Sequence, residues 1–465
     1  MQDLVFHNTL GGQRQSFVPA DPGHVTIYVC GPTVYDYAHL GNARPAVVFD
    51  VLVRLLRRRF GRVTYARNIT DIDDKINARA AESGVPIAAI TSRFADAYVE
   101  DMAAIGCAAP DLTPRVTDHV PAIIDLVTRL IARGHAYAAE GHVLFHVPSF
   151  ADYGRLSGRS LEDMIAGARV EVAPFKRHPA DFVLWKPSTP DLPGWDSPWG
   201  RGRPGWHIEC SAMIEAHLGQ TIDIHGGGAD LIFPHHENEI AQGTPAHDGA
   251  CYAGLWMHNG MVTVEGQKMA KSAGNMLTVR AALERYPAEA LRLVLLSAHY
   301  RQPVDWSQSA AERAITTLDR LYGLLGDAGD GAIEADPADL AAIEAALADD
   351  LAFPRALAAL AQLATGIRQA ADPLRQRQLQ AALRAAGGML GLLNKPEEWR
   401  EQRARMAADA SRDPLDHARI EAAIAARHAA RARRDWAAAD AIRAELAALG
   451  VTLTDQSHTT TWTRQ

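Results

Sequence analysis

The feature that most constrains the fold is an alternation of strand, helix and strand early in the chain. Residues 24–31 form an apolar run that ends in a turn, which predicts a buried strand. Residues 42–59 repeat apolar side chains at helical spacing, and residues 62–69 predict a second strand. Since parallel strands need a long crossover, usually a helix, this unit predicts a parallel sheet covered by helices.

The alternation is interrupted and then resumes. Residues 111–205 are rich in Pro and Gly and predict an irregular insertion, whereas strands are expected again at 221–225 and 252–257. The predicted fold class is therefore α/β, with a Rossmann-like parallel-sheet catalytic domain split into halves at 1–110 and 206–260. The Gly-x-Gly-x-x-Gly spelling at 200–205 follows Pro198-Trp199 and not a strand, so we interpret it as a loop.

The remainder of the chain predicts α-helical parts. Residues 261–307 contain a Gly-flanked loop, and the Ala/Leu-rich residues 308–394 predict a helical bundle. Residues 395–415 are polar and are expected as a linker. Residues 416–465 predict a small α+β module with a basic helix, whose arginines are Arg427, Arg431, Arg433 and Arg434.

Composition excludes several protein classes. The chain has 465 residues and a net charge of −8, which does not exclude a nucleic-acid partner because local basic patches make the phosphate contacts. Its 4 cysteines are too few for a disulfide scaffold. The N-terminus lacks the pattern of a signal peptide, and no apolar stretch approaches the ~20 residues of a membrane span. We expect a cytoplasmic protein that does not contact membranes.

Two short motifs indicate phosphate chemistry. His39-Leu40-Gly41-Asn42 opens the first helix, whose N-terminus favours anions, and Gly41 lets a ligand approach the backbone. Lys268-Met269-Ala270-Lys271-Ser272 lies between glycines and can neutralise charge on a departing pyrophosphate. Taken alone, each is better explained as a capped helix or a solvated loop. Together and in this order they resemble the HIGH and KMSKS signatures of class I aminoacyl-tRNA synthetases, with Asn42 and Ala270 as departures. The resemblance also implies a stem-contact region within residues 261–307.

Four donor side chains are candidates for a metal site. Cys30 ends the first strand, Cys210 follows Trp206-His207-Ile208-Glu209, and His235 and Glu239 are four residues apart on one helix face. Two thiolates, an imidazole and a carboxylate suit tetrahedral zinc. The spacing alone is better explained by two buried cysteines and a helix surface, and the chain has neither a CxxC pair nor an HExxH motif.

Longer strings resemble one family. Residues 68–76, 205–213 and 223–242 (Asn-Ile-Thr-Asp-Ile-Asp-Asp-Lys-Ile, Gly-Trp-His-Ile-Glu-Cys-Ser-Ala-Met and the run from Asp-Ile-His-Gly-Gly-Gly to Ile-Ala-Gln) are similar to cysteinyl-tRNA synthetases, and the likeness covers nearly the whole chain. The resemblance implies activation of L-cysteine by ATP with Mg²⁺ and its transfer to tRNA(Cys). It also implies a monomer and one zinc ion that recognises the thiol.

The resemblance assigns roles to particular residues. It implies zinc ligands at Cys30, Cys210, His235 and Glu239, and catalytic roles for His39, Asn42, Lys268 and Lys271. ATP is expected at Gly41, Gly227, Gly228, Asp230 and Lys271, and the amino acid at Gly31, Thr33, Thr70 and Trp206. For Trp206 a place in the core is an equal alternative. We interpret Asp71, Asp73 and Asp74 as helix-start and ion-pair residues and not as metal ligands.

Two other functions remain as alternatives. A related ATP-dependent ligase could join cysteine to an amino sugar, but it should lack the basic C-terminal module. A non-catalytic, synthetase-like tRNA-binding protein should have lost a lysine or a zinc ligand. The arginines of the first helix end, Arg54, Arg57, Arg58, Arg59 and Arg62, suit either the tRNA acceptor end or solvent.

Overall fold

The computed structural model describes residues 3–162, 173–269, 274–325, 333–412, 417–455 and 460–464. Lys271 and Ala270 of the second phosphate motif lie outside the described residues. The chain forms two compact units, residues 1–394 and residues 395–465.

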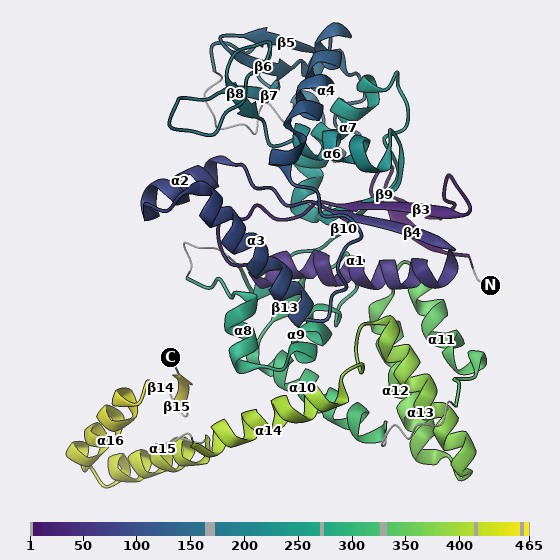
Figure 1. The fold of residues 1–465 in the computed structure, drawn as a ribbon. Helices are drawn as coiled ribbons and strands as arrows, with labels where there is room; N and C mark the ends of the chain where they lie inside the picture. The colour runs from purple at the N-terminus through teal and green to yellow at the C-terminus, as the bar shows by residue number, and fades with distance from the viewer. Residues whose placement is uncertain are drawn as a thin grey trace. The chain divides into compact units, whose positions relative to one another are not determined.

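A four-stranded parallel sheet organises the first unit, in the order β10-β9-β3-β4 (Figure 1). Its strands are β3 (His24–Val29), β4 (Arg62–Arg67), β9 (Ile222–Gly228) and β10 (Ala253–Asn259). Ile27 of β3 lies opposite Tyr65 on one side and Ile224 on the other, so β3 is a central strand. The strands and the parallel pairing agree with the sequence, and the α/β fold class is confirmed.

Helices cover both faces of this sheet (Figure 1). Helix α1 (Leu40–Arg59) connects β3 to β4 and packs against the sheet, with Val47, Val48, Val51 and Leu52 fully buried. Helices α6 (Ile208–Leu218) and α7 (Glu237–Ala246) lie on the opposite face. The carboxyl ends of the strands meet at one edge, the usual place of ligand sites in open α/β sheets.

The insertion is irregular over much of its described length, as its Pro and Gly content predicts, but it also has regular elements. It contains α4 (Val120–Ala132) and an antiparallel sheet of β5 (Ala136–Ala139), β6 (His142–Phe145), β7 (Phe182–Pro187) and β8 (Gly202–Pro204). The loop expected at 200–205 was also wrong in part, because residues 202–204 pair with β7 as an edge strand. An edge strand tolerates Pro204, which donates no backbone hydrogen bond.

Other elements of the first unit flank the sheet or follow it. They are β1 (Val5–Asn8), β2 (Gln13–Ser16), α2 (Asp74–Ser83), α3 (Ile87–Ala104), β11 (Val262–Val264), β12 (Gln267–Lys268), α8 (Val279–Arg285), α9 (Ala288–Leu295), β13 (Val304–Trp306), α10 (Gln308–Leu324), α11 (Pro337–Ala348), α12 (Phe353–Gln369) and α13 (Pro373–Met389). Helices α10 to α13 fall in the segment that the sequence predicts as a helical bundle.

The second unit is a small α+β module. It contains α14 (Pro396–Arg412), α15 (His417–Ala432), α16 (Trp436–Ala448) and a hairpin of β14 (Val451–Asp455) and β15 (Thr460–Arg464). The segment expected as a linker is helical from Pro396, since Pro suits a first helical position and Glu397 and Glu398 favour a helix N-terminus. Within the described residues, no helix is long and apolar enough to cross a membrane.

Candidate active site

One pocket of about 380 Å³ opens at the carboxyl edge of the parallel sheet. Most of the residues that the sequence assigns to a site line it together. They are Cys30, Gly31, Thr33, His39, Gly41, Asn42, Thr70, Trp206, Cys210, Gly228, Asp230, His235 and Lys268. Glu239 and Gly227 lie behind this lining. The fold therefore brings the two phosphate motifs and three of the four candidate metal ligands to one cavity.

The four candidate metal ligands converge although they come from distant segments. The donor atoms of Cys30, Cys210, His235 and Glu239 all lie within 4.8 Å of one another, and all four residues are buried. The two Sγ atoms are 3.7 Å apart. Tetrahedral zinc with Zn–S distances of about 2.3 Å separates two sulfurs by about 3.8 Å, so the spacing fits a shared zinc ion.

Electrostatics in the cluster act differently on its four members. Burial raises the pKa of the Cys30 thiol, and hydrogen bonds with Cys210 and Glu239 raise the pKa of His235 to about 10 in spite of its burial. The hydrogen bond from Cys30 lowers the pKa of Cys210 to about 6, with further help from His235. Burial alone would raise the pKa of the Glu239 carboxyl, but His225 and His235 hold it well below its usual value. Cys210 and Glu239 thus favour their anionic forms, which are the forms that bind metals.

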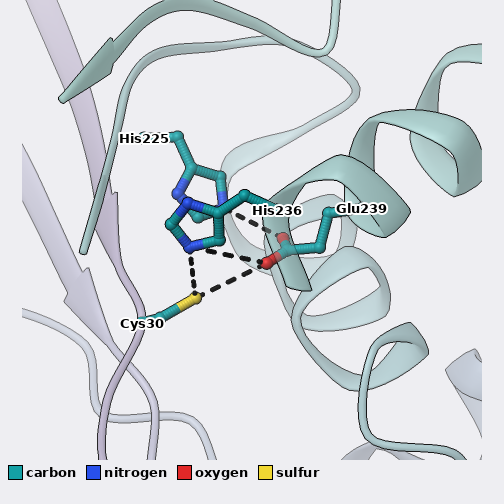
Figure 2. Close-up of side chains that lie close together, drawn as sticks. All are labelled: Cys30, His225, His236 and Glu239. Carbon is teal, nitrogen blue, oxygen red and sulfur yellow. Dashed lines mark hydrogen bonds and ion pairs between the residues drawn. The ribbon is translucent and has the colours of Figure 1, made fainter. Parts of the chain in front are cut away.

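A second donor set lies behind the first, and the sequence did not predict it. Figure 2 shows His225 and His236 with Cys30 and Glu239. His236 Nε2 lies 3.3 Å from Cys30 Sγ, and His225 Nε2 lies 2.9 Å from Glu239 Oε2. These four donors also lie within 4.8 Å of one another. Two features of the sequence could have indicated this second set of donors, namely His225 directly before three glycines and the pair of adjacent histidines His235-His236.

The buried histidines continue into a hydrogen-bonded chain. His236 Nδ1 lies 2.7 Å from His258 Nε2, and His258 Nδ1 lies 2.8 Å from the Thr9 hydroxyl. Burial and the neighbouring His225 lower the pKa of His258 to about 3. The chain is therefore neutral at ordinary pH, and it fixes the orientation of the His236 ring against Cys30.

The first phosphate motif forms the N-terminus of α1. His39 is the residue before the helix, and its backbone N–H donates to Asn42 Oδ1 at 3.2 Å, so Asn42 caps the helix. A Cβ atom on Gly41 would lie 2.9 Å from the His39 ring, which explains the glycine at this place. Gly41 and Asn42 of the first turn line the pocket, where the positive end of the helix dipole favours an anion.

The second phosphate motif begins on β12, and the residues that follow its loop contact the first motif. Lys268 is exposed at the end of β12, where Asn275 Nδ2 donates to its carbonyl oxygen. Downstream, Leu40 N–H donates to Leu277 O at 3.0 Å, and Val279 N–H donates to Ala38 O at 2.8 Å. Backbone hydrogen bonds therefore tie the far end of the lysine loop to the start of α1.

The two glycines expected at the nucleoside, Gly227 and Gly228, have different surroundings at the end of β9. A Cβ on Gly227 would lie 2.9 Å from the His236 ring, so this glycine makes room for the histidine and does not line the pocket. Gly228 and Asp230 do line the pocket. The expectation that both glycines face a nucleoside therefore fits Gly228 alone.

The residues expected around the amino acid surround the metal ligands. Trp206 is 40% exposed and stacks on the His235 ring at 4.4 Å between centroids, so it belongs to the pocket wall and not to the core. Thr70 Oγ1 donates to Glu209 at 3.3 Å, and Thr33 pairs with Thr70 as a backbone bridge. Gly31 N–H donates to Asn68 Oδ1 at 2.8 Å.

The aspartate cluster has the structural roles expected from the sequence. Asp73 caps α2 by accepting from Lys75 N–H, and Asp71 accepts from Thr117. Asp74 pairs with two cations of the insertion, Lys186 and Arg203. The interpretation is confirmed for Asp73 as a helix-start residue and for Asp74 as an ion-pair residue, whereas Asp71 is held by hydrogen bonds from Thr117.

The predicted arginines divide into exposed and buried or paired groups. Arg431, Arg433 and Arg434 are exposed at the end of α15, but Arg427 is only 4% exposed. Arg427 was therefore wrongly placed on a basic surface, because its position faces the core of the module. Three of the arginines of α1 are held in ion pairs within the chain, namely Arg54, Arg57 and Arg58.

Comparisons with known proteins agree with this geometry. Residues 16–316 match the tRNA synthetases class I (C) catalytic domain, residues 342–394 the DALR domain, and residues 413–462 the cysteinyl-tRNA ligase anticodon binding domain. A cysteine–tRNA ligase of Acidiphilium cryptum is 58% identical over 465 residues, covering 100% of both chains. One of Parvibaculum lavamentivorans is 57% identical, covering 99% of this chain and 97% of that one.

The chain belongs to the cysteine–tRNA ligase family. It is an enzyme with a class I aminoacyl-tRNA synthetase catalytic domain. Distant solved structures share the fold alone. A Mycobacterium tuberculosis methionyl-tRNA synthetase matches with TM-score 0.55 and 17% identity, covering 82% of this chain and 93% of that one. An Agrobacterium radiobacter LeuRS matches with TM-score 0.59 and 13% identity, covering 83% and 86%.

Proposed function

We propose that this enzyme activates L-cysteine with ATP and transfers it to tRNA(Cys), with a zinc ion selecting the thiol. The observation that carries the proposal is the convergence of Cys30, Cys210, His235 and Glu239 at the wall of the pocket that also holds the HIGH-like motif. We prefer this set to the one with His225 and His236 because two thiolates favour zinc. Its donors Cys30, Cys210 and His235 also line the pocket, which leaves a side open to substrate.

The proposed reaction has two steps. A carboxylate oxygen of cysteine bonds to the α-phosphorus of ATP as the bond to pyrophosphate breaks. A ribose hydroxyl of the terminal tRNA adenosine then bonds to the cysteine carbonyl carbon, loses its proton and releases AMP. The N-terminus of α1, His39, Lys268 and Lys271 would stabilise the phosphate charge, while Mg²⁺ accompanies ATP.

Selection of cysteine rests on the metal donors. When bound, zinc supplies a centre that prefers a thiolate to the hydroxyl of serine. A hydrophobic pocket alone separates near-isosteres by only ~10–200-fold, so a directional sulfur contact is needed for tight selection. Trp206, Thr33 and Thr70 would hold the rest of the amino acid beside these donors, and Gly228 and Asp230 the nucleoside.

The second unit supports tRNA as the acceptor. Its match to an anticodon-binding domain and its exposed Arg431, Arg433 and Arg434 suit tRNA phosphates. This module favours tRNA over an amino sugar, and the intact donor set disfavours a non-catalytic role. The monomeric state and the cytoplasmic location stay predictions.

The test is pyrophosphate exchange into ATP with cysteine and with serine, before and after removal of metal by a chelator. We expect exchange with cysteine alone, a strong loss after chelation, and recovery on adding Zn²⁺. Cys210→Ser should lose cysteine-dependent exchange by at least about 100-fold, as loss of metal-site support does elsewhere. The matched control Cys251→Ser replaces a free thiol outside the cluster and should behave as wild type. Equal use of serine, or full activity of Cys210→Ser, would contradict the proposal.

A further inference from the structure

Arg44 is a buried cation whose role the site has not so far explained. It lies in α1, two residues after Asn42, and its side chain is fully buried. Among the described residues, no carboxylate forms an ion pair with it. Burial of a guanidinium is costly unless every donor finds a good acceptor, so this position needs a reason.

The acceptors of Arg44 are backbone carbonyl groups from two other segments. Nη1 donates to Met261 O at 2.7 Å, and Nη2 donates to Gln302 O at 2.5 Å and to His299 O at 3.4 Å. One planar fork therefore joins α1 to the turn between β10 and β11 and to the segment before β13. Lysine presents a single point charge and cannot span these carbonyls in the same way.

The turn that Arg44 holds forms part of the pocket wall. Asn259, Gly260, Met261 and Val262 line the pocket, and Asn259 lies opposite Gly228 in the register of β10 and β9. The turn is thus a neighbour of Gly228 and Asp230. The residues assigned to the nucleoside and the turn held by Arg44 share one side of the site.

The contacts around the turn leave little room for adjustment. Gly260 N–H donates to Tyr300 O at 2.8 Å, and Val304 N–H donates to Met261 O at 3.0 Å. A Cβ atom on Gly260 would lie 2.5 Å from the Gln302 backbone. The turn therefore packs directly on residues 299–304. Arg44 of α1 donates hydrogen bonds to both of these segments and so holds them against the helix.

We propose that Arg44 is a positioning residue for ATP, which sets the Gly260-Met261 turn at a fixed place relative to the phosphate-binding N-terminus of α1. The proposal rests on the proposed function for its assignment of the nucleotide. The same helix carries Gly41 and Asn42 at the pocket, so one rigid element holds both the triphosphate site and the wall beside the nucleoside. Cysteine, which lies at the metal donors, is outside this junction.

The test compares Arg44→Lys and Arg44→Met with wild type in the full-length, zinc-loaded enzyme. We expect the KM for ATP in pyrophosphate exchange to rise by about tenfold or more, since a displacement of about 1 Å can cost ~100-fold. The KM for cysteine should change by less than about twofold, because the metal donors keep their contacts. Binding of a non-hydrolysable ATP analogue, measured by calorimetry, should weaken in parallel.

A matched control separates positioning from general stability. Arg292 is also fully buried and donates to the backbone carbonyls of Leu390 and Ile105, but it lies outside the pocket lining. Arg292→Lys should lower Tm without raising the KM for ATP. An unchanged KM for ATP in both Arg44 variants, or a parallel rise in both KM values as Tm falls, would overturn the proposal.

The two proposals fail differently. Wild-type protein that binds the ATP analogue but shows no cysteine-dependent exchange would remove the proposed function. Weaker analogue binding by Arg44→Lys would still support the positioning role in that case. Cysteine-dependent exchange with unaltered ATP kinetics in both Arg44 variants would remove only the role of Arg44.

Discussion

At the carboxyl end of β3, neighbouring residues combine the chemistry of the site with the packing that permits it. The Cys30 thiol belongs to the candidate metal site, and the next residue, Gly31, lies against the backbone at the end of the neighbouring strand. A Cβ on Gly31 would lie 1.7 Å from Asn68 O. The close approach of these two segments helps to hold Cys30 in place, and it requires a glycine at position 31.

Gly31→Ala should therefore lower both stability and metal content. We expect a loss of about 1–3 kcal/mol in the free energy of unfolding, because the backbone of residue 68 must move to admit a methyl group. Urea unfolding and metal analysis of the purified enzyme check this. Gly61→Ala is the control, since its Cβ would meet nothing closer than 3.9 Å. Equal stability of the two variants would contradict the expectation.

Among the elements, α1 connects the site to the rest of the first unit. Its N-terminus faces the pocket, Arg44 holds the β10–β11 turn, and Asp50 pairs with Arg292 of α9 in a fully buried contact. Burial alone would raise the pKa of Asp50, but Arg292 and Arg54 hold it below its usual 3.8. Neither Asp50 nor Arg292 lines the pocket, so this ion pair stabilises the packing of α1 on α9 and not the pocket itself.

Asp50→Asn should destabilise the enzyme in a pH-dependent way. At pH 7 we expect a loss of about 3–5 kcal/mol, because Arg292 is left buried without its partner. A carboxyl whose pKa is lowered by folding stabilises the protein above its unfolded pKa and loses this effect as pH falls. The difference in the free energy of unfolding between wild type and Asp50→Asn should therefore become smaller as the pH falls through 3.8 and below.

Urea unfolding at several pH values measures this deficit. The control is Glu344→Gln, which breaks the more exposed pair with Arg58 and should cost at most about 1 kcal/mol. A deficit for Asp50→Asn that does not vary with pH would show that the charge of Asp50 is not what stabilises the contact.

At the scale of the whole molecule, the chemistry and the proposed anticodon contacts belong to separate compact units. Residues 1–394 contain the pocket and every candidate metal ligand, whereas residues 395–465 have their own core of Ile420, Ile424, Leu446, Val451 and Leu453. A unit with its own core can be removed without opening the other.

A chain that ends at Asn394 should keep amino-acid activation and lose efficient tRNA charging. We expect cysteine-dependent exchange within about twofold of wild type, whereas kcat/KM for tRNA should fall by at least about 100-fold as phosphate contacts are lost. Aminoacylation at two salt concentrations and circular dichroism of the truncated chain check this. Charging that survives truncation would place the main tRNA contacts in the first unit.

The sequence by itself determined the elements whose signals are local. Apolar spacing predicted β3, α1, β4 and the parallel sheet. The two phosphate motifs were recognised only together, from their order along the chain and their resemblance to known signatures. The four metal donors were distinguished by resemblance alone, since Cys30 and Cys210 are separated by 180 positions. No local pattern in the sequence shows whether residues so far apart in the chain come into contact.

Only the tertiary structure decided the contacts between distant segments. It brought the four donor atoms together and placed His225 and His236 next to them. It also buried the Arg427 side chain within the second unit and paired the strands of the insertion into a sheet. It also showed that Arg44 reaches carbonyls more than 200 positions away. The reason is physical: helix and strand patterns arise from neighbours in the chain, whereas burial, hydrogen-bond partners and ligand geometry depend on which faces pack together.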